Sequence, residues 1–207
     1  DIFITGSDQV WNDSCTGFDK SYFLSFVKEN RKKNSYSASF GFDRIPAEHY
    51  EEYRKLLSSF NNISVREKTG SQIIKDLLNR NVEVTLDPTL LPETEDWLKI
   101  SARDLNLKEY ILVYEMAHSD SLIDFVSSLG RETGLKIIFI NNKLEKKIKS
   151  ATNVRGAGPK EFINLFSNAR YVVTNSFHGI CFSISFKKTF FAQLLPPPSK
   201  VNSRIIN

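Results

Sequence analysis

Short apolar segments alternate with segments of helical periodicity along most of this 207-residue chain. The apolar segments, such as YILVYEM and RYVVT, are rich in β-branched and aromatic residues, which is typical of buried strands. The segments between them place apolar residues three and four positions apart, as an amphipathic helix does. Repeated strand and helix units predict an α/β fold with parallel sheets and helices on both faces.

The alternation weakens between Pro88 and Lys108, where a short helical stretch, EDWLKI, is followed by polar residues. This interruption predicts two domains, one over residues 1–100 and one over residues 108–207. Because the sequence opens directly within a strand, we expect the N-terminal domain to be incomplete at its start in this excerpt. The predicted strands are 2–5, 34–41, 63–65, 82–86, 110–116, 135–140, 170–174 and 189–194, and the predicted helices are 47–60, 66–79, 95–100, 121–134, 159–169 and 176–186.

Composition excludes several classes of protein. No apolar run approaches the roughly 18 residues of a spanning helix, and we find no signal-peptide pattern in these residues. Cys15 and Cys181 are far apart and form no CxxC pair, so neither a disulfide scaffold nor a cysteine zinc site is predicted. The net charge is +4, with one basic cluster at Lys143–Lys149 that is either a solvated face or a contact to phosphate groups. We expect a cytoplasmic location, with peripheral contact at the inner face of the membrane as an alternative, and no nucleic-acid partner.

Polar residues follow several of the predicted strands. Ligands of open α/β sheets bind at the carboxyl ends of the strands, so these residues are the candidates for a site. They are Ser7, Asp8, Gln9 and Trp11 after the first strand, Arg66 after the third, Asp87 and Thr89 after the fourth, and Asn175, Ser176, Phe177, His178 and Gly179 after RYVVT. Familiar nucleotide and hydrolase signatures (GxGxxG, the P-loop, HExxH and GxSxG) are absent.

The segment NSFHG combines a helix start with a histidine. Backbone N–H groups at a helix N-terminus favour an anion, and Gly179 would let a ligand approach the backbone closely. His178 is placed to exchange a proton with a bound substrate. The alternative is that Asn175 and Ser176 only cap the helix and that His178 bonds its neighbours.

The segment GSDQVWN offers hydrogen-bonding groups, a carboxylate and a flat ring, a set suited to a sugar. Alternatively, Asp8 caps the next segment and Trp11 belongs to the core. Arg66 either pairs with a neighbouring carboxylate or binds a carboxylate or phosphate of the substrate, and Arg204, near Asn202, has the same two interpretations. His118, after another strand, is open to a structural or a functional role.

Taken in order, the segments GSDQVWN, SYSASFG, SVREKTG, LDPTLL with EDW, YVVTNSFHG and NSRI resemble the polysaccharide pyruvyl transferase family over essentially the whole chain. The resemblance implies two Rossmann-like domains that face a cleft in a GT-B-like architecture. It also implies transfer of pyruvate from phosphoenolpyruvate to two hydroxyls of a sugar, in a polysaccharide or lipid-linked repeat unit, to form a cyclic ketal. No cofactor and no metal are expected.

Under this resemblance His178 and Asp8 are the catalytic candidates. The substrate-binding candidates are Ser7, Gln9, Trp11, Arg66, Asp87, Thr89, Asn175, Ser176, Phe177, Gly179, Asn202 and Arg204. The sequence departs from the family pattern at one helix start, where Ser176, Phe177 and His178 stand in place of Arg-Leu-His. Two alternatives follow: a nucleotide-sugar-dependent glycosyltransferase, with Glu115 or Glu161 toward the ribose, and a non-catalytic relative that binds a sugar or a partner.

Overall fold

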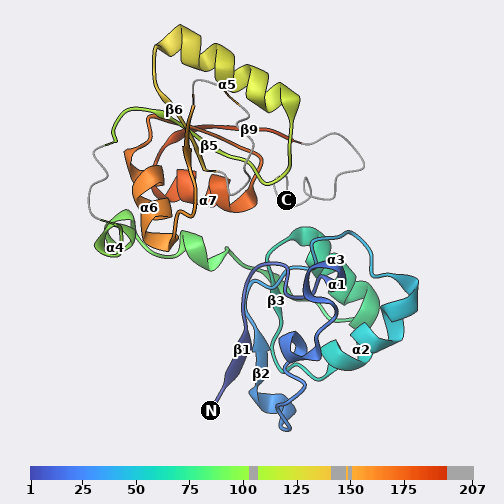
Figure 1. Ribbon diagram of the computed structural model, residues 1–207. Helices are drawn as coiled ribbons and strands as arrows, with labels where there is room; N and C mark the ends of the chain where they lie inside the picture. The colour runs from blue at the N-terminus through green and yellow to red at the C-terminus, as the bar shows by residue number, and fades with distance from the viewer. Residues whose placement is uncertain (103–106, 141–147, 149–150, 195–207) are drawn as a thin grey trace. The chain divides into compact units, whose positions relative to one another are not determined.

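The computed structural model describes residues 1–102, 107–140, 148 and 151–194 (Figure 1). The chain divides between Pro88 and Thr89 into two compact units. Unit 1 denotes residues 1–88, and unit 2 denotes the described residues from Thr89 to Leu194. None of the helices in the described part of the chain has the length and apolar character needed to cross a membrane.

Unit 1 is built on short parallel strands. Strand β1 (Phe3–Thr5) pairs with β2 (Lys33–Ser35), and β3 (Ser64–Val65) pairs with β4 (Glu83–Val84). Parallel bridges from Asn34 to Asn62 and from Ala38 to Val65 connect the two pairs. The helical segments are α1 (Asp13–Thr16), η1 (Lys20–Phe23), η2 (Asn30–Lys32), η3 (Ala47–His49), α2 (Tyr50–Ser58) and α3 (Lys68–Leu78).

Strand β2 is shorter than the predicted strand 34–41 because its backbone turns at Ser37, which has a positive φ of 54°. Serine side chains take over part of the strand pairing at this point. Ser35 Oγ donates to the Ser64 carbonyl at 3.0 Å, and Ser64 Oγ accepts from the Ser37 N–H at 3.0 Å. Side-chain hydroxyls that compete for backbone groups in this way interrupt a regular ladder.

Unit 2 contains a five-stranded parallel sheet in the order β7-β6-β5-β8-β9. Its strands are β5 (Ile111–Tyr114), β6 (Ile137–Ile140), β7 (Thr152–Val154), β8 (Tyr171–Thr174) and β9 (Thr189–Ala192). Its helical segments are η4 (Pro88–Leu90), α4 (Thr94–Lys99), α5 (Asp120–Thr133), α6 (Pro159–Asn168) and α7 (Phe177–Ser185). Strand β7 was not predicted from the sequence.

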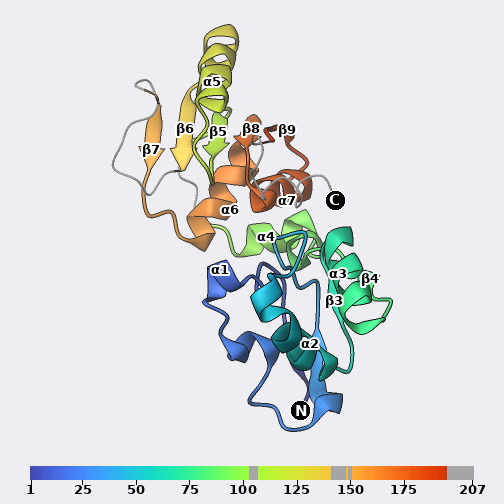
Figure 2. The ribbon, with the colours of Figure 1, turned by 90° about the vertical axis from the view of Figure 1, so that its right-hand side faces the viewer.

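Helices cover both faces of this sheet, with α5 on one face and α6 and α7 on the other (Figures 1 and 2). Successive side chains of a strand point to opposite faces, so one strand serves two cores. In β5, Leu112 packs in the core with α6 and α7, whereas Ile111 and Val113 pack in the core with α5. The helix ends agree with prediction, because Gly134 ends α5 with a φ of 68° and Pro159 is the first residue of α6.

Helix α4 packs within unit 2. Trp97 contacts Phe182 of α7 edge-on, with ring centroids 5.1 Å apart, and Thr94 Oγ1 donates to the Ser185 carbonyl at 2.6 Å. The compact units divide between Pro88 and Thr89, at the start of the predicted interruption Pro88–Lys108. The predicted first domain extends to residue 100, whereas the contacts of Thr94 and Trp97 place α4 with unit 2.

Candidate functional site

The strand order of unit 2 reverses direction between β5 and β8. From β5 the chain proceeds through β6 to β7 on one side, and β8 and β9 then lie on the other side. The register aligns the last residue of β5, Tyr114, with the last residue of β8, Thr174. Ligands of doubly wound sheets bind at such a switch point, outside the carboxyl ends of the two strands. The loops that follow Tyr114 and Thr174 are therefore the candidate site.

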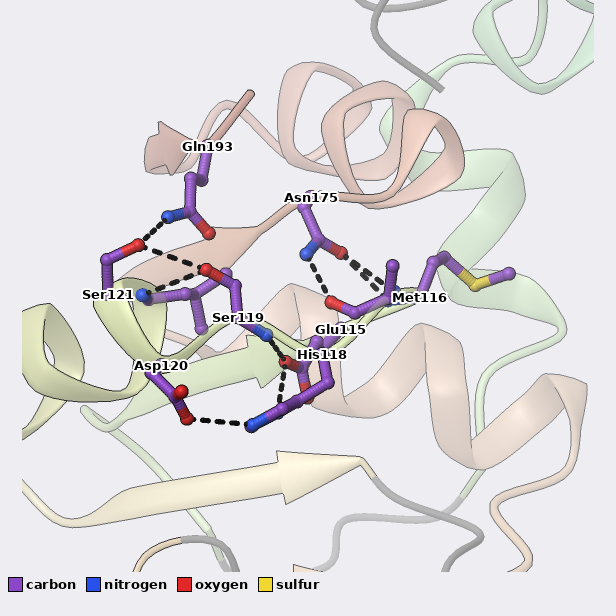
Figure 3. Close-up of polar contacts among 10 residues, drawn as sticks. Glu115, Met116, His118, Ser119, Asp120, Ser121, Asn175 and Gln193 are labelled. Carbon is purple, nitrogen blue, oxygen red and sulfur yellow. Dashed lines mark hydrogen bonds and ion pairs between the residues drawn. The ribbon is translucent and has the colours of Figure 1, made fainter. Parts of the chain in front are cut away.

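The side chain of Asn175 ties these two loops together (Figure 3). Its Oδ1 accepts from the Met116 N–H at 2.8 Å, and its Nδ2 donates to the Ala117 carbonyl at 2.7 Å. Asn175 is fully buried, so these bonds replace water for the backbone of the loop after β5. Its role in this structure is to hold the loops in place, and the predicted contact with substrate is not supported by its position.

The first turn of α7 is fixed by Ser176 and Thr174. Ser176 is the N-cap, and its Oγ accepts from the Gly179 N–H at 3.3 Å. Thr174 Oγ1 accepts from the Ser176 N–H at 3.0 Å and donates to the Tyr114 carbonyl at 2.6 Å. A Cβ at Gly179 would lie 2.3 Å from Thr174 Oγ1. The glycine therefore allows α7 to pack closely against β8, and its predicted approach to a ligand stays a prediction.

His178 is the second residue of α7 and is half-buried. Its ring lies edge-on to that of Phe177, with centroids 5.4 Å apart. Both residues are thus in the first helical turn directly after the switch-point strand β8. This is the position from which a histidine can reach a ligand at the carboxyl edge of the sheet, and its part in proton transfer stays a prediction.

A second histidine lies on the loop after β5 (Figure 3). His118 Nδ1 is 3.2 Å from Glu115 Oε1, and His118 Nε2 is 2.8 Å from Asp120 Oδ1. The same Glu115 oxygen accepts from the Ser119 N–H at 2.7 Å. The Glu115 side chain is only 2% exposed, whereas that of His118 is 50% exposed. A buried carboxylate therefore holds a solvent-accessible imidazole.

Hydroxyl groups at the start of α5 extend the cluster toward β9 (Figure 3). Ser119 is the N-cap of α5, and its Oγ lies 3.1 Å from Ser121 Oγ. Gln193, which follows β9, donates from Nε2 to Ser121 Oγ at 2.6 Å. Neither Ser121 nor Gln193 was among the predicted candidates. Gln193 lies inside the predicted strand 189–194, and only the observed end of β9 at Ala192 places it after a strand.

Unit 1 has its own charged cluster, centred on Arg66. Its guanidinium contacts Glu67 Oε1 at 2.9 Å, Asp87 Oδ2 at 3.0 Å and Asp8 Oδ1 at 3.6 Å. Ser7 donates to the same Asp87 oxygen. The side chains of Arg66, Glu67 and Asp87 are 2%, 5% and 1% exposed. The structure thus favours the ion-pair interpretation of Arg66 over a direct contact with substrate.

These neighbours keep the guanidinium charged. Burial alone would lower the pKa of Arg66, but the charge of Glu67 and the hydrogen bonds to Glu67 and Asp87 outweigh it and raise the pKa above its ordinary value. Among the described residues, the Arg66 guanidinium contacts three carboxylates, those of Asp8, Glu67 and Asp87. Only Asp8 carries its charge toward solvent, with its side chain 58% exposed.

The predicted sugar-stacking role of Trp11 is wrong. Trp11 is fully buried, with ring centroids 5.2 Å from Phe40, 5.7 Å from Phe60 and 6.2 Å from Phe23. Neither face of the indole is open to a ligand, because the chain after β1 turns into the core. Gln9 accepts from Asn12 Nδ2 at 2.8 Å, which holds the loop beside Trp11.

The remaining candidates are not brought to the switch point. The Thr89 carbonyl accepts from Ser185 Oγ at 3.2 Å, at the end of α7 opposite to His178. Asn202 and Arg204 lie outside the described residues. Within unit 2, therefore, the structure brings together Asn175, Ser176, Phe177 and His178 from the candidates, and adds Glu115 and His118.

The doubly wound parallel sheet, with polar residues at its switch point, defines an α/β protein of the Rossmann-like class. A family model described as polysaccharide pyruvyl transferase matches residues 1–192. The chain belongs to this family, which is a family of transferases. The match confirms the resemblance found in the sequence, while the individual site residues remain predictions.

One solved structure with a similar fold is a protein provisionally assigned as a UDP-N-acetylglucosamine 2-epimerase from Listeria monocytogenes, with a TM-score of 0.63 and 12% sequence identity. The match covers 99% of this chain and 59% of that chain, so this chain spans less than two thirds of the epimerase's length. The likeness confirms the predicted class of fold, α/β with Rossmann-like domains of the GT-B kind. A search of curated proteins found no significant match.

Proposed function

We propose that this protein transfers pyruvate from phosphoenolpyruvate to two hydroxyls of a sugar and forms a cyclic ketal. The family match over residues 1–192 supports the reaction class. The observation that carries the assignment to a site is His178 in the first turn of α7, directly after the switch-point strand β8. The sugar would belong to a polysaccharide or to a lipid-linked repeat unit, and the reaction would take place in the cytoplasm.

The reaction needs proton transfer in both directions. A proton adds to C3 of phosphoenolpyruvate as the π electrons form the new C–H bond, and C2 becomes an oxocarbenium-like centre. One sugar hydroxyl adds to C2 and loses its proton, and phosphate then departs with the electrons of its C–O bond. The second hydroxyl adds to the same carbon and loses its proton, which completes the ketal. An acid, a base and an anion-binding group are therefore required.

The start of α7 can supply the acid and part of the anion site. His178 would deliver the proton to C3, because an imidazole titrates near neutral pH. The positive end of the helix dipole would attract the carboxylate and phosphate of the donor. The family pattern places an arginine where Ser176 stands, so here the helix cap takes that position and the donor depends more on backbone dipoles.

Asp8, in unit 1, is the second residue predicted to be catalytic. Its carboxylate is exposed, and its backbone has a φ of 72°, which is unfavourable for a residue with a side chain. Two bonds to its carbonyl hold this conformation, from the Val10 N–H at 2.8 Å and the Ser39 N–H at 2.9 Å. Arg66, whose guanidinium lies 3.6 Å from Asp8 Oδ1, would hold this carboxylate in its direction.

A nucleotide-sugar donor is the second candidate, since the similar solved structure is named for a UDP-sugar enzyme. Of the two carboxylates considered for the ribose, Glu115 and Glu161, Glu115 is buried and accepts from the Ser119 N–H, so its position does not favour this role. Contact with a membrane surface through Lys143–Lys149 stays a prediction, because only Ile148 of this cluster is among the described residues.

The test is to incubate the full-length protein with phosphoenolpyruvate and candidate sugar acceptors, and to measure phosphate release and the mass of the product. We expect the acceptor to gain one pyruvate less one water. His178→Ala should abolish transfer and keep the fold, whereas His49→Ala, which changes a histidine beside Asp13 and Phe18 in unit 1, should retain it. Turnover with UDP- or GDP-sugars and none with phosphoenolpyruvate would reject the proposal.

A further inference from the structure

We propose that His118 is a second proton-transfer group of this site, and that the buried carboxylate of Glu115 positions it. The proposal rests on the proposed transfer of pyruvate, and it assigns the base that accepts a proton from a sugar hydroxyl. It is carried by the contacts of Glu115, His118 and Asp120, by their burial, and by the position of the loop after β5.

Glu115 fixes which nitrogen of His118 carries the permanent proton. An ionised carboxylate only accepts hydrogen bonds, so at 3.2 Å from Glu115 Oε1 the Nδ1 atom must be the donor. The Ser119 N–H, at 2.7 Å from the same oxygen, keeps the carboxylate from rotating away. By the same rule Nε2 donates to Asp120 Oδ1 at 2.8 Å in this structure. Because Asp120 is exposed and Glu115 is buried, the proton on Nε2 is the one that His118 exchanges.

His118 Nε2 points to the accessible side of the cluster. Its partner in this structure, Asp120 Oδ1 at 2.8 Å, belongs to a side chain that is 93% exposed. Pairs of this kind contribute little to stability because water competes for both groups. A sugar hydroxyl can therefore replace Asp120 at Nε2 at small cost, whereas Glu115 stays in place behind the ring.

The sheet register places the two histidines symmetrically about the switch point. Tyr114 pairs with Thr174, and His118 and His178 each follow the end of their strand by four residues. Asn175 holds the loop after β5 through Met116 and Ala117, next to the start of α7. Neighbouring strands thus each present one imidazole at the same edge of the sheet.

Two imidazoles fit a reaction that moves protons in opposite directions. As the hydroxyl oxygen forms its bond to C2, its proton passes to His118 Nε2, while the proton that His178 gave has become part of the new methyl group. The imidazolium that forms at His118 is stabilised by the negative charge of Glu115 and returns its proton to solvent or to the departing phosphate. No oxidant, reductant or further reactant is needed.

A metal site is the main alternative for two carboxylates around a histidine. Among the residues that the structure describes, no three acidic, histidine or cysteine side chains are arranged to hold a metal ion. The cluster also lacks the geometry, because Glu115 and Asp120 contact opposite nitrogens of the same ring. Two groups on opposite sides of an imidazole do not converge on a common ion.

The test compares wild-type full-length protein with His118→Asn, Glu115→Gln and the double variant, in ketal formation from phosphoenolpyruvate. We expect His118→Asn to lower kcat by about 10²- to 10⁴-fold with a small change in KM for phosphoenolpyruvate. Glu115→Gln should lower kcat by about tenfold or more. The double variant should be no slower than His118→Asn, because Glu115 acts through the imidazole. His49→Asn is the matched control and should retain the wild-type rate.

The outcomes separate this proposal from the proposed function. Ketal formation by wild type with an unchanged kcat in His118→Asn overturns the role of His118 alone. If the decrease in kcat of the double variant equals the product of the two single decreases, Glu115 does not act through His118. The positioning role of Glu115 is also overturned if circular dichroism shows that Glu115→Gln has lost folded structure. Absence of ketal from wild type overturns the proposed function, and this inference with it.

Discussion

The side-chain amide of Asn175 donates to the backbone carbonyl of Ala117 at 2.7 Å and so joins the end of β8 to the loop after β5. Replacing Asn175 by alanine leaves this carbonyl and the Met116 N–H without their partner in a buried setting. We expect the free energy of unfolding to fall by about 1–3 kcal/mol. Urea denaturation measures the change. Asn168→Ala, on the last turn of α6, is the matched control, and an equal loss there would contradict the prediction.

Gly179 is the residue against which β8 and α7 approach most closely in this site. An alanine there would place its Cβ 2.3 Å from Thr174 Oγ1 and 3.0 Å from the Thr174 Cβ. We expect Gly179→Ala to destabilise the protein by about 1–3 kcal/mol, because the helix start must shift. Thermal unfolding measures this, with Gly6→Ala as control, since a Cβ at Gly6 meets nothing within 4 Å.

Arg66 holds three acidic side chains together in unit 1. Arg66→Met removes the cation that contacts the buried carboxylates of Glu67 and Asp87, so we expect a loss of about 3–5 kcal/mol. Arg54→Met, at a side chain that is 59% exposed, should change stability by about 0.5 kcal/mol or less. If guanidinium denaturation shows equal losses, the cluster is not a source of stability.

Substitutions of Trp11 test whether this residue belongs to the core, as the structure shows, or stacks on a sugar, as the sequence predicted. We expect Trp11→Ala to cost about 3–5 kcal/mol, because it empties a fully buried position among Phe23, Phe40 and Phe60. Trp11→Phe should cost less and leave the KM for the sugar unchanged in the transfer assay. A specific rise in that KM, with stability retained, would restore the stacking role.

Two buried tyrosines, Tyr53 and Tyr110, determine how the stability of the protein changes at high pH. Burial raises the pKa of Tyr53 and of Tyr110 well above the ordinary value of 10.0, and the charge of Asp13 adds to the effect at Tyr53. The folded state binds the phenol protons of Tyr53 and Tyr110 more tightly than the unfolded state does. Their contribution to the stability of the fold is therefore complete below about pH 10 and is lost as the pH rises further.

We therefore expect a slow increase in phenolate absorbance above pH 10 that follows unfolding. Tyr53→Phe and Tyr110→Phe should each reduce its amplitude. Tyr22→Phe, at an exposed position, should leave the slow phase as it is. If the slow increase in absorbance keeps its full amplitude in both Tyr53→Phe and Tyr110→Phe, other groups cause it.

The order of strands and helices in unit 2 follows closely from the sequence, because its buried strands are continuous apolar runs and its helices carry clear end signals at Gly134 and Pro159. Strand β7 could not be predicted in this way. Its residues Thr152–Val154 are mostly polar and lie at the sheet edge, where pairing with β6 defines the strand and no apolar pattern is needed.

The sequence indicates where a candidate site lies better than it indicates which residues act there. The rule that polar residues after strands form the site selected the segment at His178, whose role stays a prediction, and it left His118 undecided. The position of a residue after a strand does not tell whether its side chain turns outward, as with Asp8, or inward, as with Trp11. The partners of Asn175 and Glu115 lie on other segments and depend on the strand order, which local sequence does not specify.

The packing of α4 on α7 bears on how this protein can be divided for study. A shortened chain that starts at residue 100 would lack Trp97 and Thr94, and would leave the apolar ring of Phe182 and the carbonyl of Ser185 open to water. A fragment intended for crystallisation or for assignment of its NMR spectrum should therefore retain the residues from Thr89 onward. The segment that reads as a linker in the sequence is the part whose removal would make the fragment prone to aggregate.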